Sequence, residues 1–136
     1  MRRRTFLLGL LAAPIVGVGP ATAQNAPLEL RIVGRPRDGQ ATFRLTNRLR
    51  EAVRYESWDG GGVHNGLQRQ VDGAWSDVGL GYCGLGREGD VTVAPGGAQT
   101  FRAHVGTERG SFRITLDVVR ASGARETVVS AAFTVA

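Results

Sequence analysis

The stretch that decides the fold runs from Phe112 to Val118 and reads Phe-Arg-Ile-Thr-Leu-Asp-Val. Large apolar residues alternate with polar ones along it, which is the period of a β-strand with one buried face. The same alternation recurs in four further segments: Leu28–Ile32, Ala41–Leu45, Phe101–Val105 and Val129–Val135. After residue 23 no stretch keeps a period of 3.6 residues, so the sequence predicts an all-β domain.

Short turn sequences separate these segments: Arg37-Asp38-Gly39-Gln40, Asp72-Gly73, Ala94-Pro95-Gly96-Gly97 and Ser122-Gly123. The Asp-Gly pair is a strong two-residue hairpin signal, because both residues tolerate the backbone that such a turn needs. Turns every ~8–12 residues are typical of a β-sandwich. We therefore expect an antiparallel, two-sheet, immunoglobulin-like sandwich of about eight strands, with a closed barrel as the alternative. In the last segment, Val129, Ala131, Phe133 and Val135 are the residues expected on the buried face.

The N-terminus has the three parts of an export signal. Arg2-Arg3-Arg4 precede an apolar run, Phe6–Val18, and the small residues Ala21 and Ala23 follow as a cleavage site. Arg3 and Arg4, followed by Thr-Phe-Leu, resemble the twin-arginine pattern, with general secretion as the other route. The expected organisation is a signal over residues 1–23, a short tail over 24–27 and a sandwich over 28–136. The protein would then be periplasmic or extracellular and touch the membrane only transiently, through its signal.

The charge of the chain looks different once this signal is set aside. All 17 basic residues are arginine, the formal charge is +5 and the isoelectric point is about 10.9, which would suit a nucleic-acid binder. Removal of the signal takes three arginines with it and leaves +2. Because no basic run remains, the sequence argues against a nucleic-acid partner. The single cysteine cannot form an internal disulfide, so stability must come from the core.

Two glycine-rich segments flank the Asp-Gly hairpin, Trp58–Gly66 and Gly79–Gly89. Their ends nearest the hairpin, Asn65–Gly66 and Gly79, should lie at the same end of the sandwich. Loops held on rigid strands are where binding residues concentrate. The candidate ligand contacts in these two segments are Trp58, His64, Tyr82, Cys83 and Arg87.

Other chemistries find less support in the sequence. No serine lies in a G-x-S-x-G elbow, and Cys83, His64 and His104 lack the spacing of a metal site. Cys83 is expected to be a packed thiol, with an intermolecular disulfide and catalysis as alternatives. Trp75 is expected in the core, whereas Trp58 and Tyr82 are suited to contact a sugar or a peptide. We assign no catalytic, cofactor-binding or metal-binding residue, and expect no cofactor.

Several short motifs resemble a bacterial immunoglobulin-like domain: Phe43–Arg48, Val53–Glu56, and Val93–Gly97 before Phe101. They are similar to the BsuPI-type proteinase-inhibitor family, in which L-T-N precedes one strand and L-x-P-G-x another. The segment 82–86, Tyr-Cys-Gly-Leu-Gly, resembles the W-C-G-x-G loop of a group of exported proteins. The resemblance covers most of Leu28–Val105 and implies the sandwich fold.

The sequence thus predicts an exported, non-enzymatic binding module that uses the glycine-rich loops at one end of the sandwich. A protein or a carbohydrate is the expected partner. One alternative is an inhibitor of an exported protease. A second is a small extracytoplasmic enzyme that uses His64 or Cys83.

Overall fold

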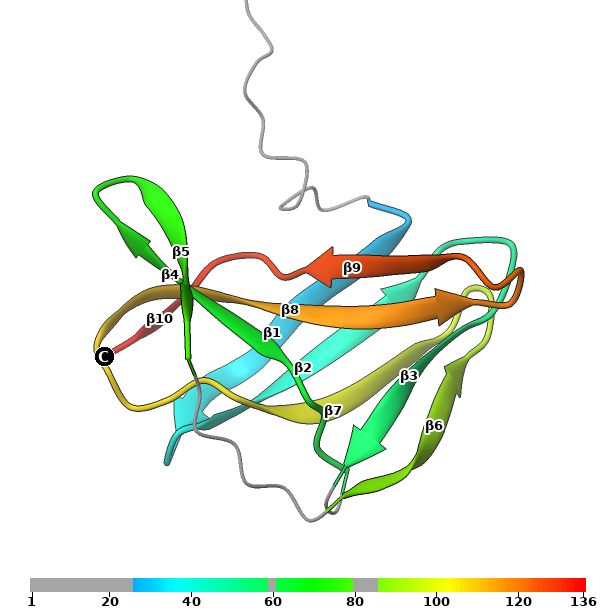
Figure 1. Cartoon of the computed structure of the whole chain (residues 1–136), viewed down its shortest axis with the longest axis horizontal. Helices are drawn as coiled ribbons and strands as arrows, with labels where there is room; N and C mark the ends of the chain where they lie inside the picture. Colours follow the sequence, from blue (N-terminus) through cyan, green and yellow to red (C-terminus); the bar gives the residue numbers. More distant parts are fainter. Residues whose placement is uncertain (1–25, 59–60, 80–85) are drawn as a thin grey trace, which may run out of the picture.

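The chain folds into two antiparallel sheets (Figure 1). The computed structural model describes residues 26–58, 61–79 and 86–136, and these residues contain strands and connections but no helix, hence none that could cross a membrane. The three-stranded sheet has the order β1 (Leu28–Arg37), β2 (Gln40–Asn47), β7 (Ala98–His104). The all-β prediction is confirmed, although the described residues form ten strands and not about eight.

The seven-stranded sheet is centred on β8 (Gly110–Arg120). Its order is β5-β4-β8-β3-β6, and β9 and β10 also pair with β8. These strands are β3 (Val53–Trp58), β4 (Gly66–Val71), β5 (Ala74–Val78), β6 (Arg87–Val93), β9 (Arg125–Val129) and β10 (Phe133–Val135). In Figure 1, β8 and β9 pass in front of β1 and β2, so the two sheets form two layers.

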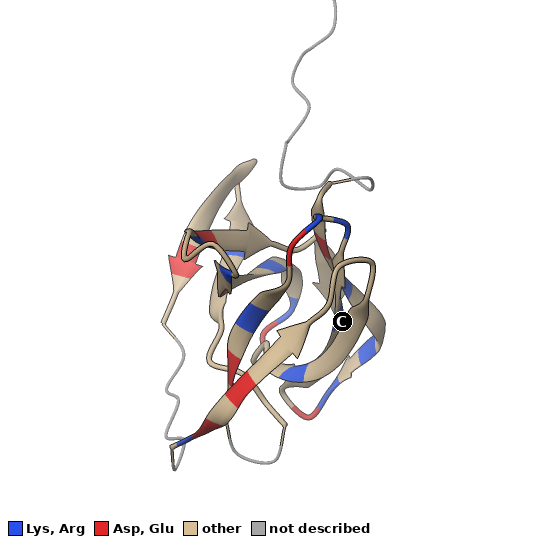
Figure 2. Ribbon diagram, turned by 90° about the vertical axis from the view of Figure 1, so that its right-hand side faces the viewer, with Lys and Arg blue, Asp and Glu red and all other residues tan. Residues whose placement is uncertain are grey.

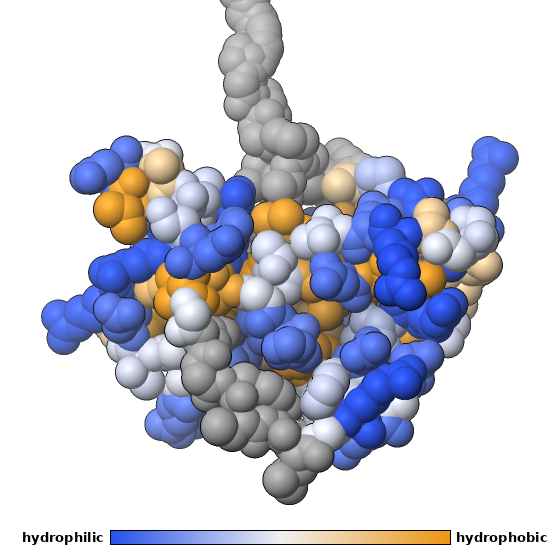
Figure 3. Space-filling view, in the orientation of Figure 1, coloured by the Kyte–Doolittle hydropathy of each residue, from blue (hydrophilic) through white to orange (hydrophobic). Residues whose placement is uncertain are grey.

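The core lies between the sheets and follows the predicted alternation. The four apolar residues of the deciding stretch are at most 3% exposed: Phe112, Ile114, Leu116 and Val118. Phe43 of β2 meets Phe133 of β10 edge to face, with 5.4 Å between ring centroids. Each such aromatic side chain contributes about 1.5–3 kcal/mol on full burial. In Figure 3, hydrophobic atoms show only in patches through a mainly hydrophilic surface.

The last predicted strand is interrupted, and its predicted buried face is wrong in its first half. Val128 and Ser130 are buried, whereas Val129 and Ala131 are partly exposed. The Ser130 hydroxyl accepts a hydrogen bond from the Ile114 N–H (2.9 Å) and donates one to the Ala131 carbonyl (2.9 Å). The side chain thus replaces a backbone partner where β9 ends, and the chain resumes as β10 with the opposite alternation.

One buried asparagine ties the two sheets together. Asn47, at the end of β2, is fully buried, and its amide donates to the carbonyls of Val93 (3.1 Å) and Ala94 (3.3 Å). Its side-chain oxygen accepts from the Leu49 N–H (2.9 Å), and its backbone carbonyl accepts from the Gly96 N–H (2.7 Å). The L-T-N and A-P-G-G motifs therefore contact each other, and their role here is structural.

Candidate functional site

A break in strand pairing opens a gap along one edge of β8 in the seven-stranded sheet. β3 pairs with β8 only through Val53–Arg120 and Arg54–Val119. Further along the same edge of β8, β4 takes over at the Gly66–Thr115 pair. Between these two points, no described strand pairs with this edge of β8.

The charges of the two strands explain why they part. If the register continued, Glu56 would lie directly opposite Asp117, and both side chains are exposed on the outer face. Like charges directly opposite each other destabilise an antiparallel pair. Alternate residues of such a strand direct N–H and C=O to the same edge. Because the Ala121 N–H donates to the Ala52 carbonyl (2.9 Å), the backbone groups of Asp117 also face the gap.

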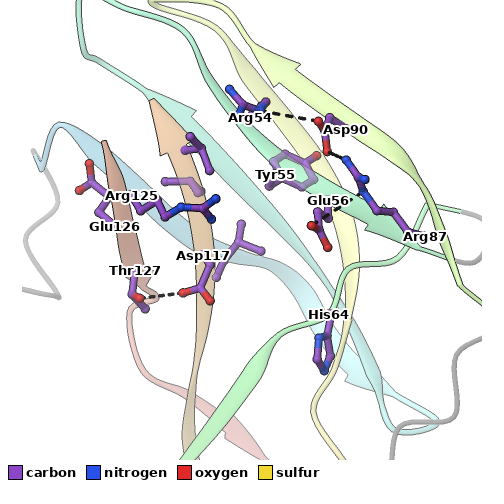
Figure 4. Close-up of a pocket in the computed structure, with 13 residues that line it drawn as sticks. Arg54, Tyr55, Glu56, His64, Arg87, Asp90, Asp117, Arg125, Glu126 and Thr127 are labelled. Atoms are coloured by element: carbon purple, nitrogen blue, oxygen red, sulfur yellow. Dashed lines mark hydrogen bonds and ion pairs between the residues drawn. The ribbon is translucent and has the colours of Figure 1, made fainter. Parts of the chain in front are cut away.

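The gap is a groove of about 540 Å³ (Figure 4). Its floor is formed by inward-facing side chains of the core, Tyr55, Leu116 and Val118. Burial raises the pKa of the Tyr55 hydroxyl above its usual range. The walls carry polar side chains from both sides: Arg54, Glu56, His64, Arg87, Asp90, Asp117, Arg125, Glu126 and Thr127. The site therefore combines a partly apolar floor with charged walls.

The wall on β3 and β6 is a network of ion pairs. Glu56 lies opposite Asp90 in the register, and two arginines offset the repulsion between them. Arg87 lies 2.5 Å from the Asp90 carboxylate and 3.8 Å from that of Glu56, and Arg54 lies 3.6 Å from Asp90. The hydrogen bond to Asp90 and its charge raise the pKa of Arg87. Figure 2 shows such blue and red segments close together on several strands. Exposed pairs add little stability, so the network mainly orients these side chains.

The opposite wall, on β8 and β9, is less neutralised. Asp117 accepts a hydrogen bond from the Thr127 hydroxyl (2.7 Å). Arg125 lies opposite Val119 in the register and extends toward the groove in Figure 4. Within the described residues, neither Asp117 nor Arg125 forms an ion pair. This wall therefore has a carboxylate and a guanidinium group available for a ligand.

The structure brings three of the predicted contact residues to one region. The rings of Trp58 and His64 lie 5.8 Å apart, and His64 and Arg87 both line the groove. Arg87 was expected in a loop, but it begins β6, so the predicted segment Gly79–Gly89 ends as a strand. Outside the described residues lie Tyr82, Cys83 and the signal residues Arg3, Arg4, Ala21 and Ala23.

The predicted hairpin is confirmed, but the expectation that Trp75 lies in the core is wrong. Leu67 pairs with Val78, so Gly66 and Gly79, the ends of the two glycine-rich segments nearest the hairpin, lie at the same end of β4 and β5. Trp75 is only half-buried, because it faces outward and the Arg113 guanidinium covers its ring at 4.4 Å. Among the described residues, no three His, Cys, Asp or Glu side chains are grouped as metal ligands.

The connection that carries His64 is fixed to the three-stranded sheet. The Val63 N–H donates to the Arg102 carbonyl (3.1 Å). The Asn65 amide donates to the His104 carbonyl (2.9 Å), and its oxygen accepts from the His104 N–H (3.1 Å). Asn65 thus imitates a strand residue on the edge of β7 and holds His64 at the end of the groove.

Comparisons with known proteins find similarity to solved structures. No family model matches the chain, and no curated protein matches it. One solved structure, the Northeast Structural Genomics Consortium target SoR45, is 16% identical, with a TM-score of 0.45 over 80% of this chain and 82% of its own. Another, from Bordetella pertussis and named as an ApaA protein, is 22% identical, with a TM-score of 0.42 over 80% of this chain and 89% of its own.

Proposed function

We propose that the chain is an exported, non-enzymatic binding module with an immunoglobulin-like sandwich fold, which holds a short peptide with a basic side chain in the groove between β3 and β8. The observation that carries the proposal is the break in pairing at Asp117. An extended peptide that enters the gap meets backbone groups of β8, as in recognition by strand addition.

The walls favour a basic side chain at this position. Among the described residues, the Asp117 carboxylate accepts a side-chain hydrogen bond only from the Thr127 hydroxyl, and Glu56 has its nearest arginine at 3.8 Å. A guanidinium or ammonium group between them would form charge-assisted hydrogen bonds, which are about twice as strong as neutral ones. The buried ring of Tyr55 and the side chains of Leu116 and Val118 would pack against the aliphatic part of that side chain.

The first test measures binding of labelled, end-blocked hexapeptides of serine and glycine that contain one arginine, one glutamate or neither. The arginine peptide should bind most tightly in fluorescence polarisation. Asp117→Asn should weaken it by about tenfold or more, because a hydrogen bond to a charged group contributes about 1.5–3 kcal/mol. Asp77→Asn is the matched control, since Asp77 lies on β5, away from the groove, and should leave binding unchanged.

Two results would overturn the proposal. The first is equal binding of all three peptides, and the second is equal weakening by Asp117→Asn and Asp77→Asn. Mass spectrometry of the peptides after incubation tests the non-enzymatic assignment, because a cleaved peptide would favour an enzyme. Export is tested separately: Arg3→Lys with Arg4→Lys should block transport if the twin-arginine route is used.

A further inference from the structure

The outer edge of β5, on the side away from β4, differs from the edges of β1, β6 and β7. The Leu30 carbonyl of β1 accepts from the Ala131 N–H (3.2 Å), and the second half of β1 is irregular in register and contains Pro36. Val63 and Asn65 cover the edge of β7, and β6 begins with three charged residues in its first four. Such features keep sheet edges from pairing with other chains. β5 has none of them, since it is regular and contains neither proline nor arginine.

The hairpin turn determines which backbone groups of β5 face this edge. Asp72 and Gly73 both have positive φ angles, 51° and 81°, so they form the two-residue turn whose flanking residues exchange both backbone hydrogen bonds. Ala74 is one of those flanking residues. Because backbone groups alternate in direction along a strand, Trp75 and Asp77 direct their N–H and C=O groups to the outer edge. No described strand pairs with that edge.

The hairpin also lies beyond the cover of the other sheet. In Figure 1, the tip formed by β4 and β5 extends away from the two layers, and Val71 near this tip is 49% exposed. Along β5, the side chains of Ala74, Ser76 and Asp77 are exposed. A further strand could therefore approach the outer edge of β5.

The sequence of β5 is complementary to a second copy of itself. A two-fold axis at Ser76, the middle residue, would align all five residues, with Ala74 opposite Val78 and Trp75 opposite Asp77 of the second copy. The backbone groups that face the edge would then form four hydrogen bonds. An axis at Asp77 would instead place two carboxylates opposite each other, which is unfavourable. We infer that two copies of the chain form a symmetric dimer through antiparallel pairing of β5 with β5, which joins their seven-stranded sheets.

Arg113 provides charge complementarity in this dimer. Its guanidinium group covers the Trp75 ring at 4.4 Å, and its Nε donates to the Gln68 side chain (2.6 Å). Within the described residues, Arg113 forms no ion pair. Gln68 lies opposite both Arg113 and Asp77 in the register, so the two charged side chains are on the same face of the sheet. The Asp77 carboxylate of the second copy therefore lies next to Trp75 on the face that carries Arg113, and the opposite charges favour this register.

The first test is sedimentation velocity of the full chain over a range of concentrations. Because only one short strand pairs, the dimer should be weak and its fraction should rise with concentration. Residues 1–25 are the same in all variants, so differences between variants report on the folded part. Asp77→Pro should weaken dimerisation about tenfold or more, because each dimer loses two hydrogen bonds while the bonds between β4 and β5 remain. Asp77→Ala is the matched control, which removes the same carboxylate but keeps the N–H, and should dimerise more tightly than Asp77→Pro.

The second test places charges at the two-fold axis. A fluorescently labelled Ser76→Lys chain should dimerise with itself several-fold more weakly than the unsubstituted chain, because the two lysines would face each other. An unlabelled Ser76→Glu chain should bind it several-fold more tightly than a Ser122→Glu chain does. Ser122 lies in the turn between β8 and β9, so this control has the same charge but keeps Ser76. Urea unfolding verifies that each variant is folded.

Three results would overturn the proposal. The first is a chain that stays monomeric at every concentration, which would assign the edge to a strand of another protein or to none. The second is equal dimerisation of Asp77→Pro and Asp77→Ala. The third is equal binding of the labelled Ser76→Lys chain by Ser76→Glu and Ser122→Glu, because two residues at the axis must face each other.

Discussion

Replacement of Asn47 by alanine should be among the most destabilising single changes in this chain. The substitution removes three side-chain hydrogen bonds to carbonyls, those of Glu51, Val93 and Ala94, and one from the Leu49 N–H. It leaves the buried Val93 carbonyl without its donor. An unsatisfied buried group costs about 1–3 kcal/mol, and each partly exposed hydrogen bond contributes about 0.5–1.5 kcal/mol. The expected loss is therefore about 3–5 kcal/mol, from a total that is typically about 5–15 kcal/mol for a domain.

Urea unfolding followed by tryptophan fluorescence measures this loss, with Asn65→Ala as the graded control. Asn65 also makes two hydrogen bonds to the backbone of another strand, but it is only half-buried, so its loss should cost about 1–3 kcal/mol. Asn47→Asp should be at least as harmful as Asn47→Ala at neutral pH, because a carboxylate would face the three carbonyl oxygens that now accept from the amide. Acidification should restore part of its stability, since the protonated acid donates a hydrogen bond. Equal costs for Asn47→Ala and Asn65→Ala would refute the idea that Asn47 ties the sheets.

Three further changes test the site and its surroundings. Gly66→Ala should destabilise the chain by about 1–3 kcal/mol, because the added methyl would overlap the Thr115 hydroxyl, and Thr115→Ala should rescue it in a double-mutant cycle of urea unfolding. Glu56→Thr with Asp117→Thr should let β3 and β8 pair further, raise stability by about 0.5–1 kcal/mol and abolish peptide binding; a loss of both would contradict the charge explanation of the gap. The raised pKa of Tyr55 means that the unfolded chain loses its proton first, so stability should fall above about pH 10, and Tyr55→Phe should reduce that fall in alkaline urea titrations.

Local pattern was sufficient to predict most strands and their buried faces. The alternation through Phe112–Val118 has the same form in the structure as in the sequence, because a half-buried strand admits only one period. The pattern failed at Ser130, where a side-chain hydroxyl replaces a backbone partner and reverses the alternation. Serine is common in both strands and turns, so nothing in the local sequence marked this break.

The groove could not be predicted from the sequence, for a different reason. It depends on Glu56 and Asp117 meeting across two strands that are distant in the sequence, and only the register shows that they would face each other. Trp58, His64 and Arg87 were predicted as contacts from their glycine-rich surroundings, and the structure places the last two on the groove. Asp117 and Arg125 looked like ordinary outward residues of regular strands, and no local signal distinguished them.

Like charges meet differently at two places in the described strands, where Arg31 faces Arg44 and where Glu56 would face Asp117. Arg31 and Arg44 stay paired because a short turn at Asp38–Gly39 joins β1 to β2 and fixes their register. Their long side chains also carry the charge away from the backbone, and Glu29 neutralises one of them. Glu56 and Asp117 have shorter side chains, and no turn joins β3 to β8, so separation of the strands is the lower-energy arrangement. Repulsion between like charges is therefore tolerated in the three-stranded sheet, whereas in the seven-stranded sheet it leaves an open groove.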